Sequence, residues 1–368
     1  MPLVAHNELP SFERLRTEGV NILPTERAVQ QDIRELHIGL CNMMPDAALE
    51  ATERQFFRLI GESNPIAQFY VHPFTFPELP RGPAAQEHIA RYYEPFEKVR
   101  EEGLDALIVS GANVTHANLA QEPFWQPLMA MIGWALESVT STLCSCLTTH
   151  AVLQCCYGQQ RTQMQRKRWG VYSHHVVEDR HPLVKGVNTR FDVPHSRWND
   201  VSRSQFETAH ARILAESNEA GVHLAVSKDG LRLVFFQGHP EYDTISLLKE
   251  YKRDTSLYAQ QLIPHYPPLP ECYFGLQERS ILEEYCARLE SALEKQETLP
   301  VFPEQLVSRR LDNTWHDSAE AIVGNWMGCI YQVTHADRRR PFMDHVNPED
   351  PLDLGTLPCT SADTKRLS

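Results

Sequence analysis

Short apolar runs alternate with amphipathic segments through the first half of the chain, and this alternation predicts its secondary structure. Strand-length apolar runs occupy residues 36–41 (LHIGLC), 66–74 (IAQFYVHPF), 105–111 (DALIVSG) and 139–146. Helical spacing of apolar residues marks residues 49–60, 91–103, 122–137 and 147–156. Strands that alternate with helices predict an α/β fold, with a mostly parallel sheet and helices on both faces.

The pattern changes after about residue 160. GVYSHHVV predicts another strand and DVPHSRWND a loop, while VHLAVSKDG and LRLVFFQGHPEYD flank a Lys-Asp-Gly turn and predict a hairpin. The proline-rich stretch IPHYPPLPEC (263–272) indicates a linker, and two more helices are expected at 278–296 and 316–333.

These elements define the expected domain organisation. One domain is predicted over residues 1–335, with a core at about 35–260, an added segment at about 263–314 and a C-terminal helix at about 316–333. Residues 336–368 contain Pro, Asp and Lys in place of apolar periodicity, so a disordered tail is expected there.

The charge and the cysteines narrow the function classes. The formal net charge of −13 argues against nucleic acid and anionic membrane surfaces as partners. The N-terminal residues lack a secretory pattern, and no apolar run approaches the roughly 20 residues that cross a bilayer, so a cytoplasmic protein is expected. Nine cysteines in irregular spacing favour reduced thiols over disulfides or zinc knuckles, and no metal site is expected.

One of these cysteines lies where a nucleophile is expected. VTSTLCSCLTTHAVLQ places Cys146 at the junction of a predicted strand and a predicted helix. A sharp turn there exposes the sulfur, and the helix N-terminus favours a thiolate. Free cysteines are more often small buried side chains, so the position alone does not assign a role.

A base and its partner follow the last predicted strand. In FFQGHPEYD, His239 and Glu241 are two residues apart, so the carboxylate can orient the imidazole toward a thiol. Backbone N–H groups after Gly111 and at the start of the helix that follows Cys146 are candidates for an oxyanion hole.

Taken together, the motifs resemble the homoserine O-acyltransferase family, and within it the homoserine O-succinyltransferases, over roughly residues 18–335. The matching stretches, in the family's order, are TERAVQQDIR, LCNMMP, LEATERQFFRLI, VSGANV, VTSTLCSC, GVYSHH, VPHSRWND, AVSKDG, QGHPEYD and NWMGCIYQVT. The resemblance implies a flavodoxin-like fold, similar to the class I glutamine amidotransferases, with a Cys-His-Glu triad.

The resemblance also implies a reaction and its residues. The reaction is transfer of a succinyl group from succinyl-CoA to the hydroxyl of L-homoserine in methionine biosynthesis, by a homodimer and without a cofactor besides the CoA thioester. The family's acyl-carrying Cys falls on Cys146, its His on His239 and its Glu on Glu241. Its substrate-binding residues fall on Lys167, Ser196 and Arg253, whose types suit carboxylate and hydroxyl groups.

The chain departs from the family pattern at the elbow. Leu147 and His150 replace the usual Trp and Gln, and a histidine near a thiol can perturb the thiol's pKa. The position that accompanies acyl choice is Thr115, where Gly goes with succinyl-CoA and Glu with acetyl-CoA. A neutral side chain does not repel a succinyl carboxylate, which favours the succinyl donor. An acetyltransferase and an amidotransferase-like hydrolase are the alternatives.

Overall fold

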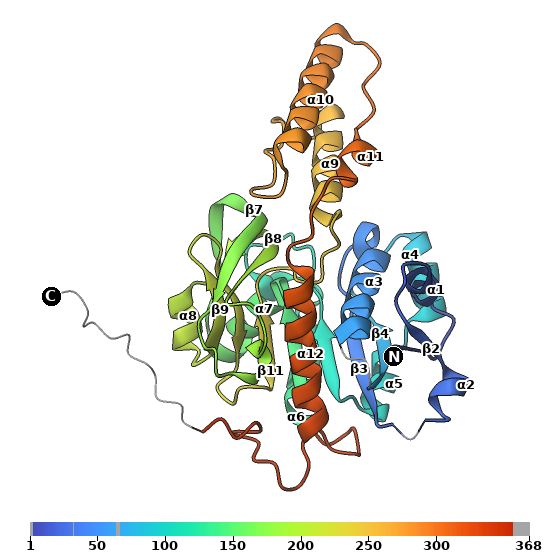
Figure 1. Cartoon of the computed structure of the whole chain (residues 1–368), viewed down its shortest axis with the longest axis vertical. Helices are drawn as coiled ribbons and strands as arrows, with labels where there is room; N and C mark the ends of the chain where they lie inside the picture. Colours follow the sequence, from blue (N-terminus) through green and yellow to red (C-terminus); the bar gives the residue numbers. More distant parts are fainter. Residues whose placement is uncertain (1–2, 32, 64–66, 356–368) are drawn as a thin grey trace, which may run out of the picture.

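The structure is a computed structural model that describes residues 3–31, 33–63 and 67–355 of the 368-residue chain. Within these residues eleven strands form one sheet, in the order β2-β1-β4-β3-β5-β6-β11-β10-β9-β7-β8 (Figure 1). The strands are β1 Leu3–Ala5, β2 Ile22–Pro24, β3 Glu35–Cys41, β4 Gln68–Phe74, β5 Ala106–Val109, β6 Ser141–Ser145, β7 Thr162–Val176, β8 Arg190–Asp200, β9 Arg212–Ser217, β10 Gly221–Val226 and β11 Leu233–Phe236.

The centre of the sheet has the flavodoxin strand order. The neighbours β4-β3-β5-β6-β11 are all parallel and, numbered by their sequence order among themselves, run 2-1-3-4-5. Strands β10, β9, β7 and β8 continue the sheet in antiparallel fashion. The predicted mostly parallel, flavodoxin-like sheet is confirmed, and so is the hairpin, which is formed by β10 and β11.

Helices cover both faces of this sheet, as predicted. The helices are α1 Pro10–Thr17, α2 Thr25–Ala28, α3 Asp46–Ser63, α4 Pro83–Tyr92, α5 Phe96–Glu102, α6 Trp125–Ser138, α7 Leu147–Tyr157, α8 Arg203–Thr208, α9 Ser246–Ala259, α10 Leu276–Lys295, α11 Glu304–Ser308 and α12 His316–Val333. Helices α1, α3 and α12 pack over one face, whereas α5, α6, α7 and α8 pack over the other. Alternate side chains of β5 enter opposite cores: Ile108 faces α3 and α12, and Leu107 faces α6 and α7.

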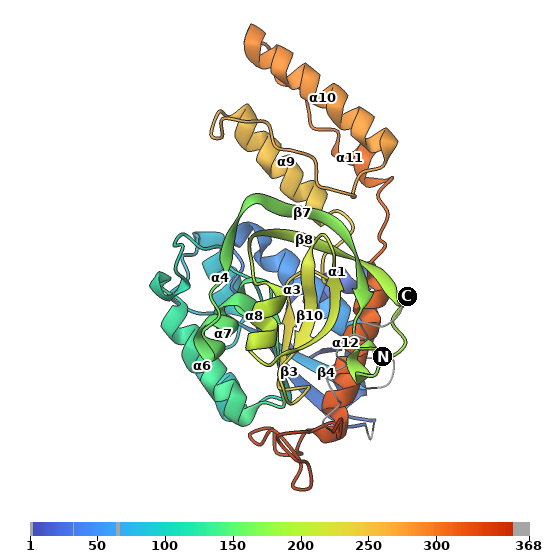
Figure 2. The same cartoon turned by 90° about the vertical axis from the view of Figure 1, so that its left-hand side faces the viewer.

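Helices α9, α10 and α11 project beyond the end of the sheet (Figures 1 and 2). A separate cluster of buried apolar side chains holds this projection to β7; its members include Trp169, Leu248, Tyr251, Phe274 and Val307. The added segment expected at 263–314 therefore joins α9 in one helical unit with its own small core.

Two sequence expectations were wrong, and both concern segments that contain a proline. DVPHSRWND was predicted as a loop, but it lies in β8, where Pro194 is paired with Val171 of β7. Residues 91–103 were predicted as one helix, but Pro95 separates α4 from α5, since proline has no N–H to continue the helical hydrogen bonds.

The expected disordered tail is also wrong for residues 336–355, which the structure describes as an ordered segment. Phe342 is buried in the core beneath α12, and the Thr140 hydroxyl donates a hydrogen bond to the carbonyl of Pro341. The rest of that prediction, residues 356–368, lies outside the described residues. Among the described helices, each is too short or too polar to span a bilayer.

Replacing Phe342 with Ala tests whether this C-terminal segment contributes to the core. Because the ring is buried, Phe342→Ala should lower the free energy of unfolding by roughly 3 kcal/mol in urea denaturation. Val29→Ala is the control, since Val29 is 68% exposed and its loss should change stability by less than about 0.5 kcal/mol. Equal effects of the two substitutions would show that the segment does not pack on the domain.

Candidate active site

Three neighbouring parallel strands deliver their carboxyl ends to one place. Gly111 follows β5, Cys146 follows β6 and His239 follows β11, and β6 lies between the other two. A Cβ placed on Gly111 would lie 3.7 Å from the Cβ of Cys146, so the loop after β5 contacts the elbow. Ligands bind at this edge of doubly wound sheets.

Cys146 forms the turn between β6 and α7. Its backbone has φ 50° and ψ −105°, a conformation that side chains other than glycine rarely adopt. Its N–H donates to the carbonyl of Phe236 on β11 at 2.7 Å, which fixes the turn to the neighbouring strand. The predicted elbow is therefore present, and its strained backbone presents the sulfur at the head of α7.

His239 lies between the thiol and a carboxylate. Its Nδ1 is 2.8 Å from Oε1 of Glu241, and Cys146 lies close enough to act on the imidazole electrostatically. Burial by itself lowers the pKa of His239, but the negative charges of Cys146 and Glu241 outweigh burial and raise it well above the usual value. The imidazole is thus held in its protonated form beside Sγ.

The His239 ring is fixed by its surroundings as well as by Glu241. Its backbone N–H donates to the carbonyl of Pro194 in β8 at 2.7 Å. Its ring stacks on Tyr242, with 4.4 Å between ring centroids. The ring therefore has little freedom to turn away from Cys146.

Two of the predicted substrate-binding residues meet at a carboxylate that the sequence prediction missed. Glu250 of α9 accepts hydrogen bonds from Lys167 (3.0 Å), Ser196 (2.6 Å) and the Tyr242 hydroxyl (2.9 Å). Burial raises the pKa of Glu250, but these donors, with Lys167 foremost, outweigh it and lower the pKa. Since Tyr242 stacks on His239, this cluster adjoins the His239 imidazole.

The remaining predicted residues are more exposed. Arg253 lies three residues after Glu250 on α9, and its side chain is 60% exposed and paired with Asp254 at 2.8 Å. Thr115 is exposed in the loop after β5, where its N–H donates to Glu122 at 2.7 Å. The structure does not place either residue in contact with the thiol within the part of the chain that it describes.

The two unusual residues of the elbow helix pack into the interior. Leu147 is buried among α6 and α7. His150 is fully buried, with Nε2 2.9 Å from Oε1 of Gln237, and burial lowers its pKa to about 3. A neutral His150 bound to Gln237 supports the strand ends, and it carries no charge that would act on Cys146.

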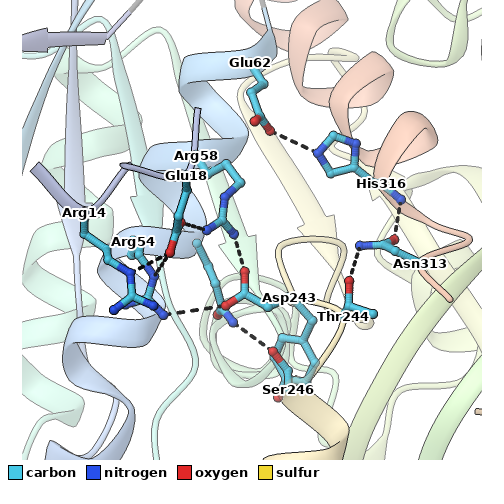
Figure 3. Close-up of polar contacts among 12 residues, drawn as sticks. Arg14, Glu18, Arg54, Arg58, Glu62, Asp243, Thr244, Ser246, Asn313 and His316 are labelled. Atoms are coloured by element: carbon cyan, nitrogen blue, oxygen red, sulfur yellow. Dashed lines mark hydrogen bonds and ion pairs between the residues drawn. The ribbon is translucent and has the colours of Figure 1, made fainter. Parts of the chain in front are cut away.

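An ion-pair network anchors the loop that carries Glu241 (Figure 3). Arg58 of α3 bridges Asp243 in that loop and Glu18 after α1, and Arg54 lies 3.6 Å from Asp243. Gln55 donates to the Ser246 hydroxyl at 2.9 Å. The loop that carries Glu241 is therefore tied to α3 through Asp243.

The sheet and this site define a class of protein, one that presents a thiol, an imidazole and a carboxylate on a flavodoxin-like fold. A family model described as homoserine O-succinyltransferase matches residues 2–336. The homoserine O-succinyltransferase of Thiobacillus denitrificans is 64% identical over 96% of this chain and 100% of its own length. That of Nitrosococcus oceani is 62% identical over 96% and 99%. The chain belongs to the homoserine O-succinyltransferase family.

Solved structures similar to this chain include two glutamine amidotransferases. The one from Thermotoga maritima has a TM-score of 0.41 at 11% identity, covering 81% of this chain and 98% of its own. The one from Methylobacillus flagellatus has a TM-score of 0.41 at 11% identity, covering 81% and 95%.

The reactivity of Cys146 tests the contact with His239. Removing the positive charge beside Sγ in His239→Ala should slow alkylation of Cys146 by iodoacetamide at pH 7 about tenfold or more, as followed by peptide mass. Cys155 is an exposed free thiol in the same molecule, and its alkylation rate should stay unchanged. An unaltered rate at Cys146 would mean that the imidazole does not activate the thiol.

Proposed function

We propose that this protein transfers the succinyl group of succinyl-CoA to the hydroxyl of L-homoserine, through an acyl-enzyme on Cys146. The family names the overall reaction, an acyl transfer of methionine biosynthesis. The observation that supports the route is the position of His239, which is hydrogen-bonded to Glu241 and lies close enough to Cys146 for the two to act on each other electrostatically. The reaction uses only side chains of the protein and the thioester of the donor, without a further cofactor.

In the first half-reaction the Cys146 thiolate attacks the thioester carbonyl of succinyl-CoA. The new S–C bond gives a tetrahedral intermediate, whose oxyanion is proposed to accept hydrogen bonds from backbone N–H groups at the head of α7 and after Gly111. The intermediate collapses by breaking the bond to the CoA sulfur, and the His239 imidazolium gives its proton to that thiolate. CoA leaves, and Cys146 carries the succinyl group as a thioester.

In the second half-reaction His239 acts as a base instead of an acid. Neutral His239 takes the proton of the homoserine hydroxyl as the oxygen attacks the Cys146 thioester. Collapse of the second tetrahedral intermediate breaks the S–C bond and regenerates the thiolate beside the imidazolium. Glu241 stabilises His239 in its charged form at both stages.

The substrate groups are assigned by charge. The Lys167 ammonium is already paired with Glu250, whereas the Arg253 guanidinium is largely exposed. We assign Arg253 to a substrate carboxylate, and Lys167, Ser196 and Glu250 to the polar end of homoserine. The Thr115 side chain itself carries no negative charge, which favours the succinyl donor over acetyl-CoA.

The proposed working form is a cytoplasmic homodimer. Eight free cysteines among the described residues, including exposed Cys155 and Cys156, suit a reducing compartment. Leu276 and Val301 on the helical projection are 89% and 91% exposed, so this projection is the surface that we propose meets a second copy.

Intact mass measures the acyl-enzyme directly. Succinyl-CoA without homoserine should add one succinyl group to the wild type and none to Cys146→Ala, and L-homoserine should remove the adduct and give O-succinylhomoserine. L-serine is the control acceptor. Faster labelling by acetyl-CoA would reassign the donor, and release of the adduct to water at the same rate without homoserine would favour the hydrolase alternative.

Glu250→Gln tests the polar cluster on α9. Loss of the buried negative charge leaves Lys167 unpaired and should lower kcat/KM for homoserine roughly 10- to 100-fold in a CoA-release assay. Glu304→Gln is the matched control. It breaks the ion pair between Glu304 of α11 and Lys252, which lies on α9 like Glu250 but is not bonded to Tyr242. Equal activity of the two variants would remove Glu250 from the site.

A further inference from the structure

A cluster of metal-ligand side chains lies in the N-terminal part of the sheet, apart from the active site. His6 follows β1, His72 is in β4, and Glu94 lies between α4 and α5. One ligand atom from each of the three residues lies within 4.8 Å of the other two. Because the three residues are far apart in sequence, their spacing gave no sign of this cluster, and no metal site was expected.

His6 presents a nitrogen that has no partner. Its Nδ1 is 3.2 Å from the carbonyl oxygen of Val4, so Nδ1 carries the proton and Nε2 has the lone pair. Nε2 is buried and makes no hydrogen bond within the part of the chain that the structure describes. A backbone carbonyl that fixes the far nitrogen of a histidine is a common arrangement around metal ligands.

The ring nitrogens of His72 and His37 make a row of three polar contacts that reaches Glu94 at one end and Glu35 at the other. Nδ1 of His72 is 2.7 Å from Oε1 of Glu94, and its Nε2 is 2.9 Å from Nδ1 of His37. Nε2 of His37 is 3.4 Å from Oε2 of Glu35. These three contacts need three protons and two neutral imidazoles supply two, so either one ring is an imidazolium or a cation stands in place of the proton between His72 and Glu94.

We infer that His6, His72 and Glu94 bind a divalent transition-metal ion of the Zn²⁺ class. The ion is bound by Nε2 of His6, Nδ1 of His72 and the Glu94 carboxylate, and it replaces any proton on that Nδ1, which leaves to solvent. Nε2–H of His72 then donates to His37, and Nε2–H of His37 donates toward Glu35. With the ion bound, every nitrogen of the row has a partner, and two imidazoles and a carboxylate form a common zinc ligand set.

The acidic residues around the cluster favour a bound cation, but one lysine competes with the ion for Glu94. Glu94 and Glu35 are acidic, while Lys98 lies 2.9 Å from Oε2 of Glu94, and Arg338 acts on His37 from the C-terminal segment. Lys98 is 55% exposed and lies 3.9 Å from Glu102, so it can move from Glu94 to that carboxylate.

The ion would be structural. His6 follows a three-residue strand, and β1 is held to β4 by pairing at Leu3 and Phe69. A shared ligand set would fasten the N-terminal segment to β4 and to the start of α5, so it contributes to the stability of this edge and not to acyl transfer.

The test is a Zn²⁺ titration of chelator-treated full-length protein by calorimetry, with thermal unfolding as a second readout. Wild type should bind one Zn²⁺ at this cluster and unfold at a higher temperature when it is bound, and His6→Gln should weaken that binding at least about tenfold. His88→Gln is the matched control, because His88 pairs with Glu53 at 3.0 Å and is not one of the three proposed ligands, and this variant should bind like the wild type.

Two further measurements distinguish binding at this cluster from unfolding of a variant and from binding at a thiol. Lys98→Met removes the competing ammonium and should tighten binding, which unfolding of the variant would not imitate. Co²⁺ should give the absorption of nitrogen and oxygen ligands without a sulfur-to-cobalt charge-transfer band. Binding that is unchanged in His6→Gln, a sulfur band that points to Cys146, or no binding to the wild type would each overturn the proposal.

Discussion

The parallel pairing of β5, β6 and β11 is the constraint on which the rest of the site depends. Backbone hydrogen bonds fix the three strands side by side, so Gly111, Cys146 and His239 arrive together although up to 128 residues separate them. The bond from Cys146 N–H to the Phe236 carbonyl continues this pairing into the elbow. A change of register in either pair would carry the thiol away from the imidazole.

Neighbouring charged groups set the protonation state of His239 and fix the loop around it. Burial disfavours a charged imidazole, yet Glu241 and Cys146 together hold His239 in its charged form. Arg58 and Arg54 anchor the loop that carries Glu241, and Glu250 orders Lys167 and Ser196 next to Tyr242. The surroundings of His239 are therefore fixed by contacts from both α3 and α9.

Local patterns in the sequence predicted the central strands, most of the longer helices and the elbow, because short apolar runs and amphipathic periods reflect burial directly. They could not predict what depends on pairing across the sheet: β8 was hidden by Pro194, and Phe342 anchors a polar segment through one ring. Glu250 was missed because nothing local distinguishes a buried glutamate on an amphipathic helix from an exposed one. The triad positions were found through motifs, and their meeting required the fold.

Isotope exchange tests the central claim, that acyl transfer proceeds through a free acyl-enzyme, most directly. Labelled CoA would be incubated with succinyl-CoA and the protein in the absence of homoserine, and label would be followed into succinyl-CoA. The account predicts exchange in the wild type and none in Cys146→Ala, because the first half-reaction is complete and reversible without the acceptor. Exchange that occurs only when homoserine is present would contradict it, and would mean that the succinyl group passes directly between the two substrates.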